Sequence, residues 1–133
     1  RPADIHGKEL LRIGEKYYFE DLGIRHAIRP FQANDIGQIL ENVVCQHLLI
    51  HQYSLFVGRY ADKEIDFVAE KNGERLYIQV ATTLRHEKTK EREFGNLLAI
   101  NDHYPKMVIT LDEEEGASFR GIQQIPVREF LLR

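Results

Sequence analysis

The clearest candidate for chemistry in this sequence lies on two strand-like runs joined by Asn72-Gly73. Asn-Gly is the preferred two-residue turn of a β-hairpin, because the type I′ turn needs a positive φ at both central residues. Such a turn also sets how the two strands pair. Asp66 is therefore predicted to lie opposite Gln79, and Glu64 opposite Ala81.

Side chains alternate along a strand, so these four residues are predicted to share one face of the hairpin. The other face is predicted to carry the apolar side chains of Ile65, Phe67, Ile78 and Val80. Directly opposed Cβ atoms lie about 5 Å apart. One oxygen of Asp66 and one of Gln79 are thus predicted to reach a shared cation.

A further oxygen ligand is predicted on the helix before the hairpin. Glu41 lies at the edge of an apolar stripe with three- and four-residue spacing, so its side chain is predicted to point at the sheet. An unpaired buried carboxylate is costly, and Mg²⁺ prefers such oxygen ligands. The alternative is structural: Glu41 and Asp66 form ion pairs or hydrogen bonds, and the Gln79 amide donates to Asp66.

The elements that must position these residues follow from hydrophobic periodicity. A helix is predicted from Asn34 or Asp35, either of which can cap it, to about His51. Three strands are then predicted over 53–60, 64–70 and 75–81. They are followed by a helix over 87–100, strands over 107–111 and 121–126, and a short helix over 127–132. The order α-β-β-β-α-β, with a β-α tail, predicts an α/β protein.

This order and several short stretches resemble a known group of proteins. The chain is similar to the PD-(D/E)XK, or restriction-endonuclease-like, superfamily. More narrowly it resembles DUF4143, a C-terminal domain that follows the ATPase module of prokaryotic ATP-binding (AAA or STAND-like) proteins. The resemblance covers about residues 8–132, in the stretches Glu15-Lys16-Tyr17-Tyr18-Phe19, Asp21-Leu22-Gly23-Ile24-Arg25, Ile39-Leu40-Glu41-Asn42, Lys63-Glu64-Ile65-Asp66-Phe67, Tyr77-Ile78-Gln79-Val80, Arg92-Glu93 and Tyr104-Pro105-Lys106.

The resemblance implies a restriction-endonuclease-like αβββαβ core, with a mixed central sheet flanked by helices. It places the superfamily's helical acid at Glu41, its first motif acid at Asp66, its second at Gln79 and its lysine at Ala81. The last two positions depart from the pattern, since an amide brings no charge and Ala81 has no polar group. In the superfamily the lysine is thought to activate the attacking water, and losing such a group commonly costs several kcal/mol of transition-state stabilisation.

A lysine from elsewhere is the alternative that would restore the site. Lys88 and Lys90, on the first turns of the second helix, are the candidates, and Lys63 is another although it should point to the opposite face from Glu64. Glu64 itself is predicted to pair with a nearby arginine or lysine.

Other patterns are weaker signals of function. His47 and His51 have the i,i+4 spacing of some zinc sites, but no third ligand is evident nearby. Cys45 is predicted to be a small buried residue. The mixed charges of residues 85–93 favour a solvated helix face over a phosphate-binding stripe. The aromatic run 17–19 is predicted to pack in a core or domain interface rather than stack on bases.

Composition limits the class of protein. The 133 residues suit one domain, the net charge of -3 argues against a free-standing duplex binder, and no apolar run approaches the length of a membrane span. The single cysteine excludes an intrachain disulfide and predicts a cytoplasmic protein.

Residues 1–30 are predicted to be a lead-in arm or linker and 31–133 the nuclease-like domain. The chain starts at Arg1 and is predicted to be a piece of a longer protein.

Three functions follow as hypotheses. The first is a catalytically inactive or impaired accessory domain of a larger ATP-binding protein, acting as an interaction or regulatory module and retaining some DNA or RNA contact. The second is a Mg²⁺- or Mn²⁺-dependent nuclease with an altered site at Glu41, Asp66 and Gln79. The third is a dimerisation module that uses the aromatic run 17–19 and the tail Phe130-Leu131-Leu132. The chain has no Gly-x-x-x-x-Gly-Lys-Ser/Thr loop, so it is not expected to bind ATP that way.

Overall fold

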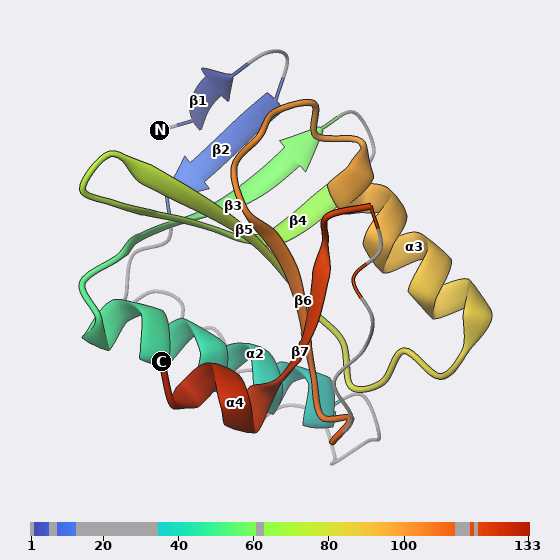
Figure 1. Cartoon of the computed structure of the whole chain (residues 1–133). Coiled ribbons are helices and arrows are strands. Elements are labelled where there is room, and N and C mark those ends of the chain that lie inside the picture. The colour runs from blue at the N-terminus through green and yellow to red at the C-terminus, as the bar shows by residue number, and fades with distance from the viewer. Residues whose placement is uncertain (1, 6–7, 13–34, 61–62, 114–117, 119) are drawn as a thin grey trace.

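The computed structural model describes residues 2–5, 8–12, 35–60, 63–113, 118 and 120–133. A seven-stranded sheet forms the centre, and its strands lie side by side in their order along the chain (Figure 1). The elements are β1 (Pro2–Ile5), β2 (Lys8–Arg12), α2 (Asp35–Ile50), β3 (Ser54–Tyr60), β4 (Lys63–Lys71), β5 (Glu74–Val80), α3 (Glu87–Leu98), β6 (Lys106–Thr110), β7 (Gln123–Pro126) and α4 (Val127–Leu131).

The sheet is mixed. Strands β1 to β5 pair antiparallel, whereas β5, β6 and β7 run parallel. Parallel neighbours need a crossover connection, and α3 supplies it between β5 and β6. The predicted α/β class, with a mixed central sheet flanked by helices, is confirmed. The elements predicted after residue 34 agree with the observed ones to within two residues at each end.

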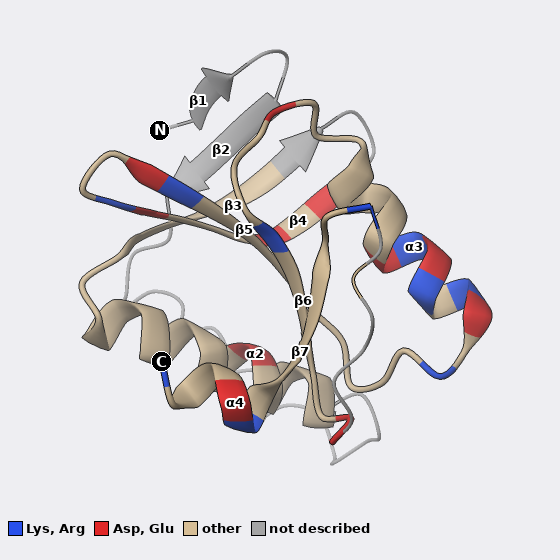
Figure 2. Ribbon diagram, viewed as in Figure 1, with Lys and Arg blue, Asp and Glu red and all other residues tan. Residues whose placement is uncertain are grey.

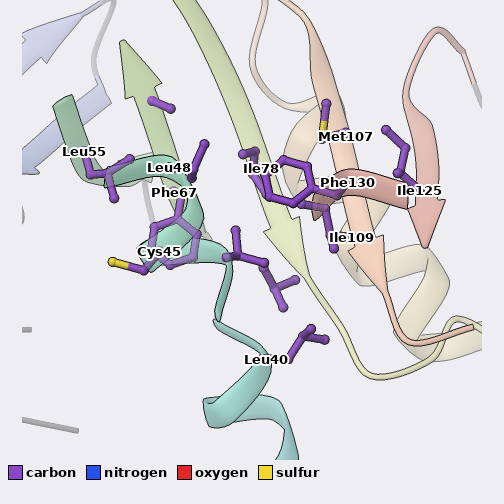
Figure 3. Packing of buried hydrophobic residues seen from close by; sticks show 13 residues of the cluster. Leu40, Cys45, Leu48, Leu55, Phe67, Ile78, Met107, Ile109, Ile125 and Phe130 are labelled. Atoms are coloured by element: carbon purple, nitrogen blue, oxygen red, sulfur yellow. The ribbon is translucent and has the colours of Figure 1, made fainter. Parts of the chain in front are cut away.

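Two hydrophobic clusters hold the helices against opposite faces of the sheet. The larger lies under α2 and α4 and includes Leu40, Val44 and Leu48, which recur every four residues along α2. Leu40 and Leu48 are labelled in Figure 3. The second lies under α3 and includes Phe94 and Leu97. The apolar stripes seen in the sequence therefore mark the buried sides of both long helices, and the strands between them are covered on both faces.

The β4–β5 hairpin has the predicted turn and register. Asn72 has φ 53° and Gly73 has φ 80°, as a type I′ turn requires. The strands then pair from Lys71 with Glu74 to Phe67 with Ile78. The regular ladder ends at this last pair, one residue short of Asp66, so the predicted face-to-face pairing of Asp66 with Gln79 is not a ladder pair.

An extra residue lies in β4 at this point. Phe56 pairs with Val68 and Gly58 with Ile65. Between these pairs β4 has two residues and β3 has one. Such a β-bulge shifts the alternation of side chains on the strand that carries it. Ile65 accordingly packs in the cluster under α3, while Phe67 packs in the cluster under α2. The prediction that these two residues share a face is wrong, because it assumed unbroken alternation.

Part of the predicted lead-in belongs to the sheet. β1 and β2 form an antiparallel pair, and β2 continues the sheet beside β3. These two strands were not predicted, because their residues give a short and weak alternation. The aromatic run 17–19 and the capping residue Asn34 lie outside the described residues. A domain boundary near residue 30 stays a prediction.

The bulge predicts a strict size limit at Gly58. A Cβ built there would lie 3.0 Å from a methyl of Val68 and 3.1 Å from the Cβ of Ile65, the two residues that flank the bulge. We expect Gly58→Ala to lower the free energy of unfolding by about 1–2 kcal/mol, because neither β-branched neighbour can move away easily. Urea unfolding measures it. Gly95→Ala is the matched control: nothing lies within 4 Å of its Cβ, so it should be neutral or stabilising, and equal effects would contradict the account.

Candidate functional site

Where the ladder between β4 and β5 ends, side chains take the place of backbone partners. The Oε1 of Gln79 accepts a hydrogen bond from the backbone N–H of Asp66 at 2.7 Å. The Oδ2 of Asp66 accepts one from the backbone N–H of Val80 at 2.8 Å. Each strand thus binds the other through one side chain, an arrangement that we call the Asp66–Gln79 clasp.

The Gln79 amide uses both of its polar atoms in this arrangement. Its Nε2 donates to the backbone carbonyl of Glu64 at 3.1 Å, and the residue is only 2% exposed. Asn96 of α3 donates to the same carbonyl at 3.2 Å. An ionised glutamate has no donor, so it could not make the bond to the carbonyl of Glu64. The amide, and not an acid, matches the hydrogen-bonding needs of this position.

Asp66 lies in a strongly acidic setting. Burial raises the pKa of its carboxyl group well above the ordinary value, and the charge of Glu41 raises it further. Glu93 and Glu64 add smaller effects in the same direction, while the hydrogen bond from Val80 opposes them. All the charged side chains that shift this pKa are carboxylates, and the effect of Glu41 places this residue of α2 close enough to Asp66 for their charges to interact.

Glu93 is the member of this group that the sequence analysis missed as a site residue. It lies on α3 and is 8% exposed. Burial raises its pKa, and its Oε1 lies 3.4 Å from the Nε of Arg92. Its Oε2 is buried without a hydrogen-bond partner in the described part of the chain. The signal in the sequence was its place beside Phe94 and four residues before Leu97, on the apolar side of the helix.

The remaining predicted site residues do not complete a nuclease centre. Ala81 is half-buried against the cluster under α3. Lys88 and Lys90 are exposed on a helix whose charges alternate in sign (Figure 2), and Lys63 is also exposed. Glu64 is exposed, and its backbone carbonyl, rather than its carboxylate, accepts the hydrogen bond from Gln79.

A divalent cation does not fit this arrangement well. Among the described residues, no three histidine, cysteine or acidic side chains are grouped so that they could hold a metal ion. A cation between Asp66 and Gln79 would share two oxygens that already accept backbone hydrogen bonds, and the Gln79 amide would bring it no negative charge. The geometry therefore favours a structural role for the two residues.

A second polar network anchors the loop before β6. The hydroxyl of Tyr77 donates to Asp102 at 2.7 Å, and the Nζ of Lys106 lies 2.9 Å from the other oxygen of that carboxylate. Lys106 also donates to the carbonyls of Asp102 and Tyr104. Burial raises the pKa of Tyr77 to about 12. Tyr77, Tyr104 and Lys106 belong to stretches that carried the family resemblance, and here they hold the loop against the sheet.

Several weaker candidates take structural positions. Cys45 is fully buried in the cluster under α2, as predicted. Phe130 is 4% exposed and packs in that cluster, so it cannot serve the predicted dimer surface, whereas Leu131 and Leu132 are exposed. His47 and His51 lie with ring centroids 4.3 Å apart at the end of α2. None of the described helices has the length and apolar character needed to cross a bilayer.

The fold is that of a mixed α/β domain in which carboxylates gather around Asp66, where the ladder between β4 and β5 ends. The chain belongs to the DUF4143 family, a domain of unknown function, which matches residues 36–130. An uncharacterised protein of Haemophilus influenzae is 44% identical over 131 residues, which make up 98% of this chain and 32% of that protein. The chain thus spans about a third of the length of this relative. No solved structure matches the chain.

The raised pKa of Asp66 predicts that this residue lowers the stability of the folded protein as the pH rises. As the pH rises, the unfolded chain loses this proton first, so the wild type loses stability from the ordinary aspartate range up through the raised pKa. Asp66→Asn keeps an oxygen for Val80 and removes the charge. We expect it to unfold at a higher temperature than the wild type at pH 7, with the difference vanishing near about pH 3.

Asp102→Asn is the matched control with the opposite sign. Burial alone would raise the pKa of Asp102, but the hydrogen bonds from Tyr77 and Lys106 outweigh it and lower the pKa. Removing this carboxylate should therefore destabilise the protein at pH 7. Thermal unfolding followed by circular dichroism between the two pH values checks both variants. An Asp66→Asn protein no more stable than the wild type at pH 7 would refute the assignment.

Proposed function

We propose that this chain is a nuclease-like accessory domain of a larger ATP-binding protein, without cleavage activity of its own, that acts as an interaction or regulatory module. The observation that carries the proposal is the full use of the Gln79 amide by the backbone of β4. In an active member of the superfamily an acid would hold metal at this position. The amide strengthens the sheet at the place where the chemistry would otherwise occur.

Electrostatics supports the loss of cleavage. A phosphodiester that approached Asp66 would meet the charges of Glu41, Glu64 and Glu93, with Ala81 where the superfamily has its lysine. Cleavage requires preorganised positive charge or hydrogen-bond donors where negative charge develops. The described residues around Asp66 offer the opposite, so binding of the backbone at this point is unfavourable without a bound cation.

The role within a larger protein rests on the length of the relative and on the resemblance. The chain corresponds to 32% of the protein from Haemophilus influenzae. The upstream ATPase module is implied by the similarity to ATP-binding proteins, and it would supply the ATP-binding residues that this chain lacks. The proposal places the domain in the cytoplasm, in keeping with its single, buried cysteine.

The acids around Asp66 are also the one observation that favours the alternative, a Mg²⁺- or Mn²⁺-dependent nuclease with an altered site. In that alternative Glu93 would supply part of the charge that Gln79 does not, since its Oε2 is buried and lacks a partner in the described part of the chain. The two functions differ in whether cleavage depends on Asp66.

Cleavage assays on the purified chain separate them. Single-stranded, duplex and branched DNA and RNA would be incubated with the wild type and with Asp66→Ala, in Mg²⁺ and in Mn²⁺. We expect no cleavage by the wild type above the level of Asp66→Ala. Cleavage that disappears in Asp66→Ala would overturn the proposal.

A restored variant makes a negative result informative. Gln79→Glu combined with Ala81→Lys rebuilds the superfamily pattern. If it cleaves while the wild type does not, the two departures are the cause of inactivity. Its melting temperature should fall relative to the wild type, because the carboxylate introduced by Gln79→Glu cannot donate to the carbonyl of Glu64.

A further inference from the structure

A small pocket lies at the end of β4 far from Asp66, where α2, α4 and the sheet meet. Its cavity volume is about 230 Å³. The floor is apolar, with Leu48, Met107 and Phe130 all buried (Figure 3). Ligand pockets for drug-sized molecules measure roughly 300–1,000 Å³, so this one suits a smaller molecule.

The rim of the pocket carries basic side chains. His47 lines it from α2, His51 lines it from the turn that follows α2, and Lys71 lines it from the end of β4. Tyr53 adds a hydroxyl, and Arg133 a guanidinium. None of the described side chains that line the pocket is acidic, although the chain as a whole has 21 acidic against 18 basic residues. Every polar side chain named here can donate a hydrogen bond, and an anion is the complementary ligand.

The end of α2 does not cancel this preference. A helix C-terminus normally presents bare carbonyl oxygens, which repel anions. Here the carbonyls of His47, Leu48 and Leu49 accept hydrogen bonds from the backbone N–H groups of residues 51, 53 and 52. These carbonyls are therefore satisfied within the protein, and the polar side chains that line the pocket here are the imidazole rings of His47 in α2 and of His51 just after it.

Lys71 is the group best placed to bind an anion. Its Nζ lies 5.2 Å from the centre of the Tyr53 ring, over the ring face. No ion pair of Lys71 occurs within the described residues, whereas the neighbouring Glu70 is paired with Arg75. A cation held over an aromatic ring, beside an apolar floor, keeps its charge available at a fixed place.

We propose that this pocket binds a small organic acid, whose anionic group meets Lys71 and the two imidazoles while its apolar body covers Phe130 and Met107. The inference goes beyond the proposed function and does not depend on it, because the pocket shares no residue with the Asp66–Gln79 clasp. It gives the accessory domain a ligand of its own, through which a metabolite could act on the larger protein.

Phenylacetate is the probe, and the uncharged phenylacetamide of nearly the same shape is its control. Ring-proton signals of the histidines in the purified chain would be followed by NMR as each is added up to about 20 mM, the range of weak small-ligand binding. We expect saturable shifts at His47 and His51 with phenylacetate, none at His86 and His103, and at least about fivefold weaker binding of phenylacetamide.

Two variants locate the charge. Lys71→Gln should weaken phenylacetate binding at least about fivefold, which is the loss expected for one charge-assisted contact. His51→Gln should weaken it by a similar factor. Because His51 is exposed, this substitution should not affect folding. Lys88→Gln, on exposed α3, should leave it unchanged. The proposal is overturned if no saturable shift occurs, if phenylacetamide binds equally well, or if Lys71→Gln and Lys88→Gln bind alike.

Discussion

The reciprocal hydrogen bonds between Asp66 and the Gln79–Val80 segment are the interactions on which the centre of this fold depends. β4 carries an extra residue here, and its ladder with β5 stops at Phe67 and Ile78. Without the two side chains, the N–H groups of Asp66 and Val80 would lose their partners between two packed layers of helix. Buried backbone donors are rarely left unpaired in folded proteins. A carboxylate and an amide thus finish the ladder that the bulge interrupts.

This constraint also decides what the acids can do. Asp66 is held where burial, and then the charges of Glu41 and Glu93, raise the pKa of its carboxyl group, although the hydrogen bond from Val80 opposes them. Asp66 and Gln79, two residues that the resemblance assigns to a metal site, thus lie close together, but one oxygen of each already accepts a backbone hydrogen bond. Fold resemblance alone would have assigned a nuclease, and the hydrogen bonds of Gln79 argue for a scaffold in its place.

Local features allowed much of the fold to be predicted. The Asn72-Gly73 turn, the stripe of α2 and the charge pattern of α3 each depend on a few neighbouring residues, and all three led to elements with nearly the observed bounds. The bulge was missed because it depends on contacts between strands, with Gly58 as its only mark in the sequence. β1 and β2 were missed because their alternation is short and weak, and because the pairing of β2 with β3 is a long-range contact.

The candidate site was predicted in its members but not in its bonds. Counting from the turn placed Asp66 beside Gln79, but the two residues meet through a hydrogen bond from the backbone of one to the side chain of the other and not as a ladder pair. The count from the turn could not show that the side chains of Asp66 and Gln79 would each bind the backbone of the opposite strand. Nor could it show that Glu93 of α3 would lie near Asp66. Those features depend on how far β4 and β5 separate, which no local pattern reports.

The most direct test follows the amide signals of Asp66 and Val80 by NMR while Mn²⁺ is added. Mn²⁺ broadens the signals of nuclei close to its binding site. If the two residues act as a structural clasp, both amides remain visible, exchange slowly with solvent and broaden no more than others at similar depth. If these two signals broaden first, at low concentrations of Mn²⁺, and do so no longer in Asp66→Asn, the site binds metal and the account is wrong.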